Sequence, residues 1–184
     1  MTTARDIAVK SRISKNVDRG EHGSTLIETV IAMFLLSVGV LGVMGALSVA
    51  ITQNWNMGDR ATRTTEYAQD KMEQLLALGF NDSASNTATF PTASTGGTGL
   101  GGVMAANATV GGVTSGSPIT GYVDYVNSAG SFQTTSTGAL YIRQWRISTN
   151  ATGTLKTVTV VTRALISSHG ANAPSTTLVS IKSL

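Results

Sequence analysis

The longest apolar stretch of the chain lies near its N-terminus. Residues 30–51 provide twenty-two consecutive positions without a charged side chain. Because a helix needs about 20 apolar residues to cross the hydrocarbon core of a bilayer, this stretch predicts a membrane-spanning helix. One acid, Glu28, stands just before the run. A carboxylate at mid-depth in a membrane costs on the order of a few kcal/mol, so its place at the head of the helix requires a reason.

Beyond residue 51 the chain becomes polar but keeps a helical period. The segment 52–78 has no proline, and small or apolar residues recur every three or four positions. We therefore predict one helix from Thr25 to about Leu78, with Gly79 as its C-cap. The expected buried stripe comprises Ala61, Thr65, Ala68, Met72, Leu75 and Leu76. The expected solvated side comprises Asp59, Arg60, Arg63, Glu66, Asp70, Lys71 and Glu73. Asp59 and Arg63 are spaced for an i,i+4 ion pair.

The middle of the chain, residues 80–121, has a different composition. Gly, Ser, Thr, Ala and Asn dominate it, and it is almost free of charge. Such composition predicts a loop region or an insertion, with one short strand near residues 110–113.

Alternating apolar and polar positions mark the last part of the chain, residues 122–184. Strands are predicted at 122–126, 139–148, 155–166 and 178–181, and the turn residues 150–153 make the second and third a hairpin. The alternation indicates an antiparallel sheet with one face buried, which the apolar stripe of the helix would cover. The predicted fold class is thus α+β, a long N-terminal helix packed on a small antiparallel sheet.

Individual side chains of these strands are assigned from the same alternation. Trp145 is expected in the core. The predicted apolar positions are Leu140, Ile142 and Ile147, set against Arg143 and Arg146, followed by Val158, Val160 and Leu165 in the next strand.

Charge and chemistry-bearing residues narrow the function classes. Residues 1–23 hold five basic and three acidic side chains, which is +2 of the formal +3, and the near-neutral remainder gives no basic patch for nucleic acid. The chain has no cysteine, and its two histidines are His22 and His169. Without a Cys/His cluster or a serine in a nucleophile elbow, we expect neither a metal, a cofactor nor an enzyme.

Three interpretations of the apolar run compete. A secretory signal peptide would have a shorter apolar core followed by a cleavage site. A plain signal anchor fits the length, and the basic residues before the run place residues 1–23 in the cytoplasm and the head in the periplasm. The third interpretation is a prepilin signal, in which cleavage falls before the run, between Gly23 and Ser24.

The stretch GSTLIETVIAMFLLSVGVLGVMGAL resembles the N-terminus of type IV pilins and pseudopilins, and within them the PilV group of minor pilins. The resemblance implies that a prepilin peptidase cuts after Gly23 and methylates the new amino terminus on Ser24, which stands where relatives often have Phe. A carboxylate four residues on, Glu28, can neutralise that amine in a packed bundle of low dielectric constant. In the family this pairing registers each incoming subunit.

The apolar run contains three glycines at intervals of three residues, Gly39, Gly42 and Gly45. Small residues allow a second membrane helix to approach closely, and glycine also weakens a helix. Relatives often carry a proline near the position of Gly45, so the glycines are expected to serve helix packing or flexibility instead.

The resemblance also implies a function, partners and a location. We expect a minor pilin that helps to prime or cap a type IV pilus, with other pilins, the prepilin peptidase and the inner-membrane assembly platform as partners. It would cross the inner membrane once and then enter a cell-surface pilus. The alternatives are a minor pseudopilin of a type II secretion system and a signal-anchored periplasmic binding module.

Overall fold

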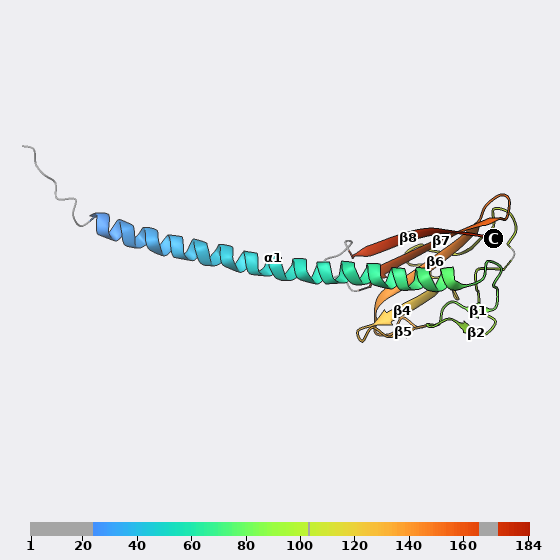
Figure 1. Cartoon of the computed structure of the whole chain (residues 1–184). Coiled ribbons are helices and arrows are strands. Elements are labelled where there is room, and N and C mark those ends of the chain that lie inside the picture. Colours follow the sequence, from blue (N-terminus) through green and yellow to red (C-terminus); the bar gives the residue numbers. More distant parts are fainter. Residues whose placement is uncertain (1–23, 103, 166–172) are drawn as a thin grey trace, which may run out of the picture. The chain divides into compact units, whose positions relative to one another are not determined.

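The computed structural model describes residues 24–102, 104–165 and 173–184 of the chain. The chain divides into two units, residues 1–50 and 51–184. Helix α1 (Ser24–Ala77) begins in the first unit and ends in the second (Figure 1). It confirms the long helix predicted from the sequence to within a residue at either end. The leader predicted at residues 1–23 lies outside the described residues.

The part of α1 within the first unit is apolar and exposed. Its side chains from residue 25 to residue 50 are all exposed. The helix contains a window with a mean hydropathy of 2.5, and by length and composition it can cross a membrane. Apolar side chains in this state are suited to a lipid or protein environment rather than to water.

The second unit is built on an antiparallel sheet with strand order β5-β4-β6-β7-β8, and β3 pairs with β6 as well. The strands of this sheet are β3 (Thr109–Gly111), β4 (Val123–Asn127), β5 (Phe132–Gln133), β6 (Ala139–Thr149), β7 (Leu155–Ala164) and β8 (Ser175–Ser183). A separate two-stranded ribbon consists of β1 (Ser85–Asn86) and β2 (Ala93–Ser94). This arrangement confirms the predicted α+β class.

The central hairpin follows the predicted turn. In the register of β6 and β7, Trp145 stands opposite Val160. The side chain of Asn150 closes the turn, because its Oδ1 accepts hydrogen bonds from the backbone N–H groups of Thr154 and Leu155 at 2.9 and 3.0 Å. Gly153 takes a φ of 71°, which residues with a side chain rarely adopt.

The core lies between the C-terminal part of α1 and one face of the sheet (Figure 1). Its main cluster comprises Ala68, Met72, Leu75, Leu100, Trp145, Ile147, Val158 and Val160. Trp145 is fully buried, as predicted. Of the predicted helix stripe, Ala68, Met72 and Leu75 are buried, Thr65 and Leu76 are half-buried, and Ala61 is exposed. Thr64 and Tyr67, which were not predicted, are buried as well.

The predicted side-chain assignment of β6 was wrong in part. Side chains alternate strictly along a strand, so Leu140 and Ile142 share one face and Ile147 lies on the other. Arg143 lies on the same face as Ile147 and is fully buried, although it was expected in solvent. In the next strand Leu165 is 44% exposed, because β7 ends at Ala164. The predicted end of that strand, residue 166, lies outside the described residues.

The far face of the sheet is not simply solvated. Gln144, Thr159 and Val161 point to this face and are buried. The segment 113–118 lies against Gln144, whose Nε2 donates to the carbonyl oxygen of Thr114 at 3.1 Å. Arg163 donates to the carbonyl oxygen of Val113 at 2.6 Å. Polar side chains therefore attach the loop to the sheet.

The segment 80–121 holds more structure than its composition predicts. The predicted short strand is present as β3, but the β1–β2 ribbon was not predicted. The buried ammonium group of Lys156 donates hydrogen bonds to the carbonyl oxygens of Phe80, Leu100 and Gly102. Backbone oxygens of this segment thus satisfy a buried cation, which orders a chain that has few apolar residues.

The end of α1 differs from the prediction. Gly79 does not take the left-handed conformation of a glycine C-cap. Instead, Lys182 of β8 donates to the carbonyl oxygen of Leu76 at 2.6 Å. A cation at a helix C-terminus is favourable because the last carbonyl groups carry partial negative charge.

Candidate functional site: the processing and assembly segment

The predicted processing site lies where α1 begins. Gly23 lies outside the described residues, and of Ser24 only the backbone is described, as the first residue of the helix. Glu28 follows four residues later and is exposed. Four helical residues span about 6 Å, so its carboxylate lies one turn from the position where cleavage would create an amine. The pairing of these two groups stays a prediction.

The three glycines lie in an uninterrupted part of α1. A Cβ atom added to Gly39, Gly42 or Gly45 would meet no atom within 4 Å. The fold of this chain therefore does not require glycine at these positions, although each glycine weakens a helix by about 1 kcal/mol relative to alanine.

The helical period relates the glycines to the acid. At 100° per residue, Gly39 and Gly42 lie within about 40° of Glu28 around the helix axis, and Gly45 lies roughly a quarter turn away. One face of α1 thus carries the carboxylate of Glu28 and two glycines, which have no side chain. Such a face suits close approach of another helix, and this role also stays a prediction.

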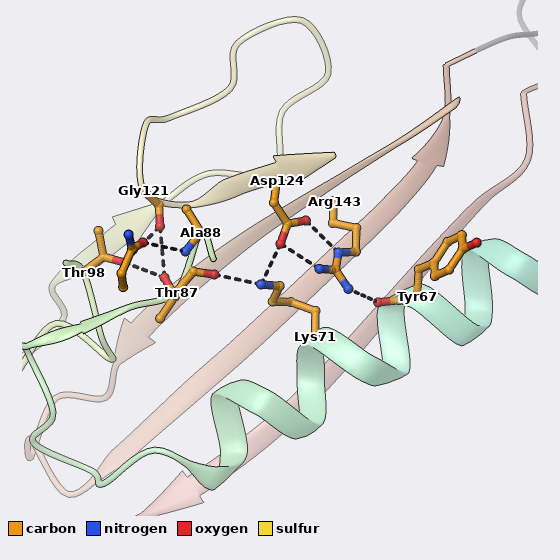
Figure 2. Close-up of polar contacts among 9 residues, drawn as sticks. Tyr67, Lys71, Thr87, Ala88, Thr98, Gly121, Asp124 and Arg143 are labelled. Carbon is orange, nitrogen blue, oxygen red and sulfur yellow. Dashed lines mark hydrogen bonds and ion pairs between the residues drawn. The ribbon is translucent and has the colours of Figure 1, made fainter. Parts of the chain in front are cut away.

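A second arrangement, in the head, fixes the helix to the sheet. Asp124 of β4 accepts hydrogen bonds from Nε of Arg143 at 2.6 Å and from Nη2 at 2.7 Å, and Lys71 Nζ lies 2.7 Å from its Oδ2 (Figure 2). Arg143 also donates to the carbonyl oxygen of Tyr67 on α1 at 3.1 Å. All three charged side chains are fully buried. Two cations thus share one carboxylate in the interior.

Burial governs the electrostatics of this cluster. The pKa of Lys71 is lowered to about 8, chiefly by burial and in part by the positive charge of Arg143, while Asp124 opposes the shift. The ammonium group also lies 4.4 Å from the ring centroid of Trp145. Lys71 was predicted on the solvated side of the helix, and that prediction was wrong. An available signal was Asp124 itself, an acid within an otherwise apolar strand, which requires a buried cationic partner.

The same cluster reaches the segment 80–121. Lys71 Nζ donates to the carbonyl oxygen of Thr87 at 2.7 Å (Figure 2). The hydroxyl groups of Thr87 and Thr98 both donate to the carbonyl oxygen of Gly121, at 3.0 and 2.9 Å. Helix, sheet and connecting segment therefore meet at one polar centre inside the head.

Asp82 has a structural role in the head. Asp82 Oδ1 accepts hydrogen bonds from the backbone of Ala84 and Ser85 at 2.9 and 3.2 Å, and hydrogen bonding, first of all from the Ser85 side chain, lowers its pKa. Among the described residues, no group of three or more His, Cys, Asp or Glu side chains could hold a metal ion. His22 and His169 lie outside the described residues. The predicted Asp59–Arg63 ion pair is present at 3.4 Å and is solvent-exposed.

Comparison with known proteins bears on the N-terminal segment. The family model of the prokaryotic N-terminal methylation motif matches residues 18–44, a range that includes Gly23, Ser24 and Glu28. No curated protein and no solved structure matches the chain. The motif indicates a type IV pilin-like or pseudopilin substrate of prepilin peptidase, and it supports a structural subunit rather than an enzyme. Together with the apolar helix, it supports anchoring of the chain in a membrane.

Proposed function

We propose that this protein is a minor pilin that is cut after Gly23, methylated on Ser24 and incorporated into a type IV pilus. The observation that carries the proposal is the position of the methylation motif. It covers the start of α1 and most of the exposed apolar part of this continuous helix. The same helix ends in the core of an α+β head. The PilV-like character of the segment GSTLIETVIAMFLLSVGVLGVMGAL supports the minor-pilin assignment.

The proposed mechanism uses the apolar part of α1 twice. In the inner membrane its exposed side chains face lipid, with the N-terminus in the cytoplasm and the head in the periplasm. In the filament the same side chains pack against the helices of other pilins, and the head faces outward. The glycine-bearing face allows that close packing, and Glu28 neutralises the amine of Ser24 on its own chain or a neighbour's. The partners are the prepilin peptidase, major and minor pilins and the assembly platform.

One alternative shares every feature of this mechanism. A minor pseudopilin of a type II secretion system would be processed in the same way and would enter a short periplasmic pseudopilus instead. Gene neighbourhood distinguishes the two, since the first predicts genes for pilus assembly next to this one and the second predicts secretion genes. A signal-anchored binding module is the other alternative, and it would keep its leader.

Incorporation into filaments tests the proposal. Surface filaments are sheared from cells that express the full chain, and the protein is quantified in the sheared fraction and in the membranes. We expect Glu28→Ala to be cleaved normally but to be strongly depleted from the sheared fraction, because the amine of Ser24 would lose its counter-charge. Glu66→Ala is the matched control, since it removes an exposed carboxylate from the head part of the same helix.

Two results would count against the proposal. Wild-type amounts of Glu28→Ala in filaments would exclude the amine-pairing mechanism. Absence of the wild-type protein from filaments, in cells that assemble normal pili, would exclude incorporation itself.

A further inference from the structure

The two tryptophans of the chain lie in opposite environments. Trp145 is fully buried in the core of the head, whereas Trp55 on α1 is 77% exposed. Trp55 is the most exposed aromatic side chain among the described residues. A tryptophan has a large apolar ring and one N–H donor, and in water the apolar ring has no apolar surface to pack against. An environment that is apolar on one side and hydrated on the other would use both.

The position of Trp55 along the helix is informative. The charge-free residues 30–51 span about 33 Å as a helix, close to the hydrocarbon thickness of about 30 Å. Trp55 follows Ile51 by four residues, which adds about 6 Å. Its immediate neighbours, Gln53, Asn54 and Asn56, are polar but uncharged, and the first charges follow at Asp59 and Arg60. Polarity therefore rises in steps along α1, as it does from hydrocarbon through headgroups to water.

We propose that Trp55 binds the headgroup layer on the periplasmic side of the inner membrane and fixes the depth of α1 before assembly. Its ring would lie against the upper acyl chains and its indole N–H would donate to glycerol or phosphate oxygens, the position in which tryptophan is enriched in membrane proteins. The partner is thus a phospholipid interface, in continuity with the apolar span that precedes it. This inference rests on membrane insertion of α1 and is independent of whether the chain later enters a pilus.

The head of the same chain does not occupy this position. The buried side chains of α1 begin at Thr64, nine residues or about 13 Å further along the helix. In a lipid interface the ring of Trp55 would be covered by lipid, although the head beyond it is in water. A second protein chain packed on Trp55 in the membrane is the competing occupant, and the experiment below separates the two.

Fluorescence quenching in vesicles measures the depth of Trp55. The full chain is reconstituted at low protein density in phosphatidylethanolamine–phosphatidylglycerol vesicles that contain phosphatidylcholine brominated either near the headgroup or near the chain end. The signal of Trp55 is the difference between wild type and Trp55→Phe, since buried Trp145 is common to both. Two variants in the Trp55→Phe background calibrate the scale, Val49→Trp within the apolar span and Gln69→Trp on the exposed side of the head.

We expect the shallow bromine to quench Trp55 more strongly than the deep bromine does. Val49→Trp should show the reverse order, and Gln69→Trp should respond only to the aqueous quencher acrylamide. Quenching of Trp55 by acrylamide alone would overturn the proposal, as would quenching by neither lipid nor acrylamide, which would indicate protein contact. Flotation of the vesicles shows whether the protein is bound to them, so it separates an absence of lipid quenching from a failure of α1 to insert. Mass analysis of the N-terminus tests the pilin assignment separately.

Discussion

Removing the carboxylate of Asp124 tests the energetic role of the buried cluster. Lys71 and Arg143 are fully buried and lie 2.7 and 2.6 Å from this carboxylate. Asp124→Asn keeps the shape of the side chain but leaves these two cations without their shared counter-charge. Loss of one partner from a buried ion pair costs about 3–5 kcal/mol. A domain with a free energy of unfolding of about 5–15 kcal/mol would lose about a fifth or more of its stability.

Lys71→Met provides the matched control. It removes one of the two cations and leaves Arg143 and Asp124 as a balanced pair. The variant loses the hydrogen bond to the carbonyl oxygen of Thr87, worth about 1 kcal/mol, but it also removes the cost of burying an ammonium group. We therefore expect Asp124→Asn to be more destabilising than Lys71→Met by about 2 kcal/mol or more. The double variant should cost less than the two single changes added together, because they share one network.

Urea unfolding of the full chain in detergent micelles gives these energies. The near-ultraviolet circular dichroism of Trp145, in a Trp55→Phe background, reports the packing of the head. The reasoning would be refuted if Asp124→Asn stayed within about 1 kcal/mol of wild type, or if Lys71→Met were the more damaging change.

The remaining predictions concern the same head. The pKa of Lys71 is about 8 in the folded chain, against an ordinary value of 10.5 for an exposed lysine, so the unfolded chain binds more protons between these two values. The titration of Lys71 should therefore contribute a rise of about 3 kcal/mol in the free energy of unfolding from pH 8 to pH 10.5, and Lys71→Met should remove this contribution in urea titrations across that range. Lys156→Met should leave three backbone oxygens without their donor, and limited proteolysis should then cut segment 80–102 faster, whereas unchanged cutting would contradict the role of the ammonium group. Gly111→Ala should cost about 2–4 kcal/mol in the same titration, because its φ is 75° and the new Cβ would overlap a backbone oxygen of β6. Gly138→Ala, with a φ of 70° but open space, should cost only about 1 kcal/mol, and equal costs would refute the overlap.

The parts of the fold that local patterns encode were predictable from the sequence. The charge-free run and the three-four spacing predicted α1 almost to the residue, and alternation with the Asn150 turn predicted the β6–β7 hairpin. The β1–β2 ribbon was not predictable in this way. Its strands are two residues long, too short to show a period, and the adjoining Thr87 is bound by Lys71 and Gly121, which are distant in sequence.

The buried charges show where such patterns fail. Lys71 and Arg143 were assigned to solvent because charged side chains are usually exposed. Their burial depends on Asp124, which lies more than fifty residues from Lys71 in the sequence and meets it only when helix and sheet pack. A pairing of this kind has no local signal, and a sequence pattern can at most flag the acid within an apolar strand.

The processing segment is the opposite case. Gly23, Ser24 and Glu28 form a linear motif, so the sequence alone predicts the segment, and the family model of the N-terminal methylation motif matches the range that contains them. The structure adds that Glu28 is exposed and that a side chain at Gly39 or Gly42 would meet no atom of this chain. The proposed partners of these residues are the amine that cleavage would create and the helices of other chains, so their roles remain predictions.

The mass of the N-terminal peptide tests the central claim most directly. The full chain is expressed with a prepilin peptidase, purified from membranes and digested, and the N-terminal peptide is identified by mass spectrometry. We predict a peptide that begins at Ser24 and carries one methyl group on its amine. A peptide that retains residues before Ser24, or that begins within the apolar run, would contradict the account.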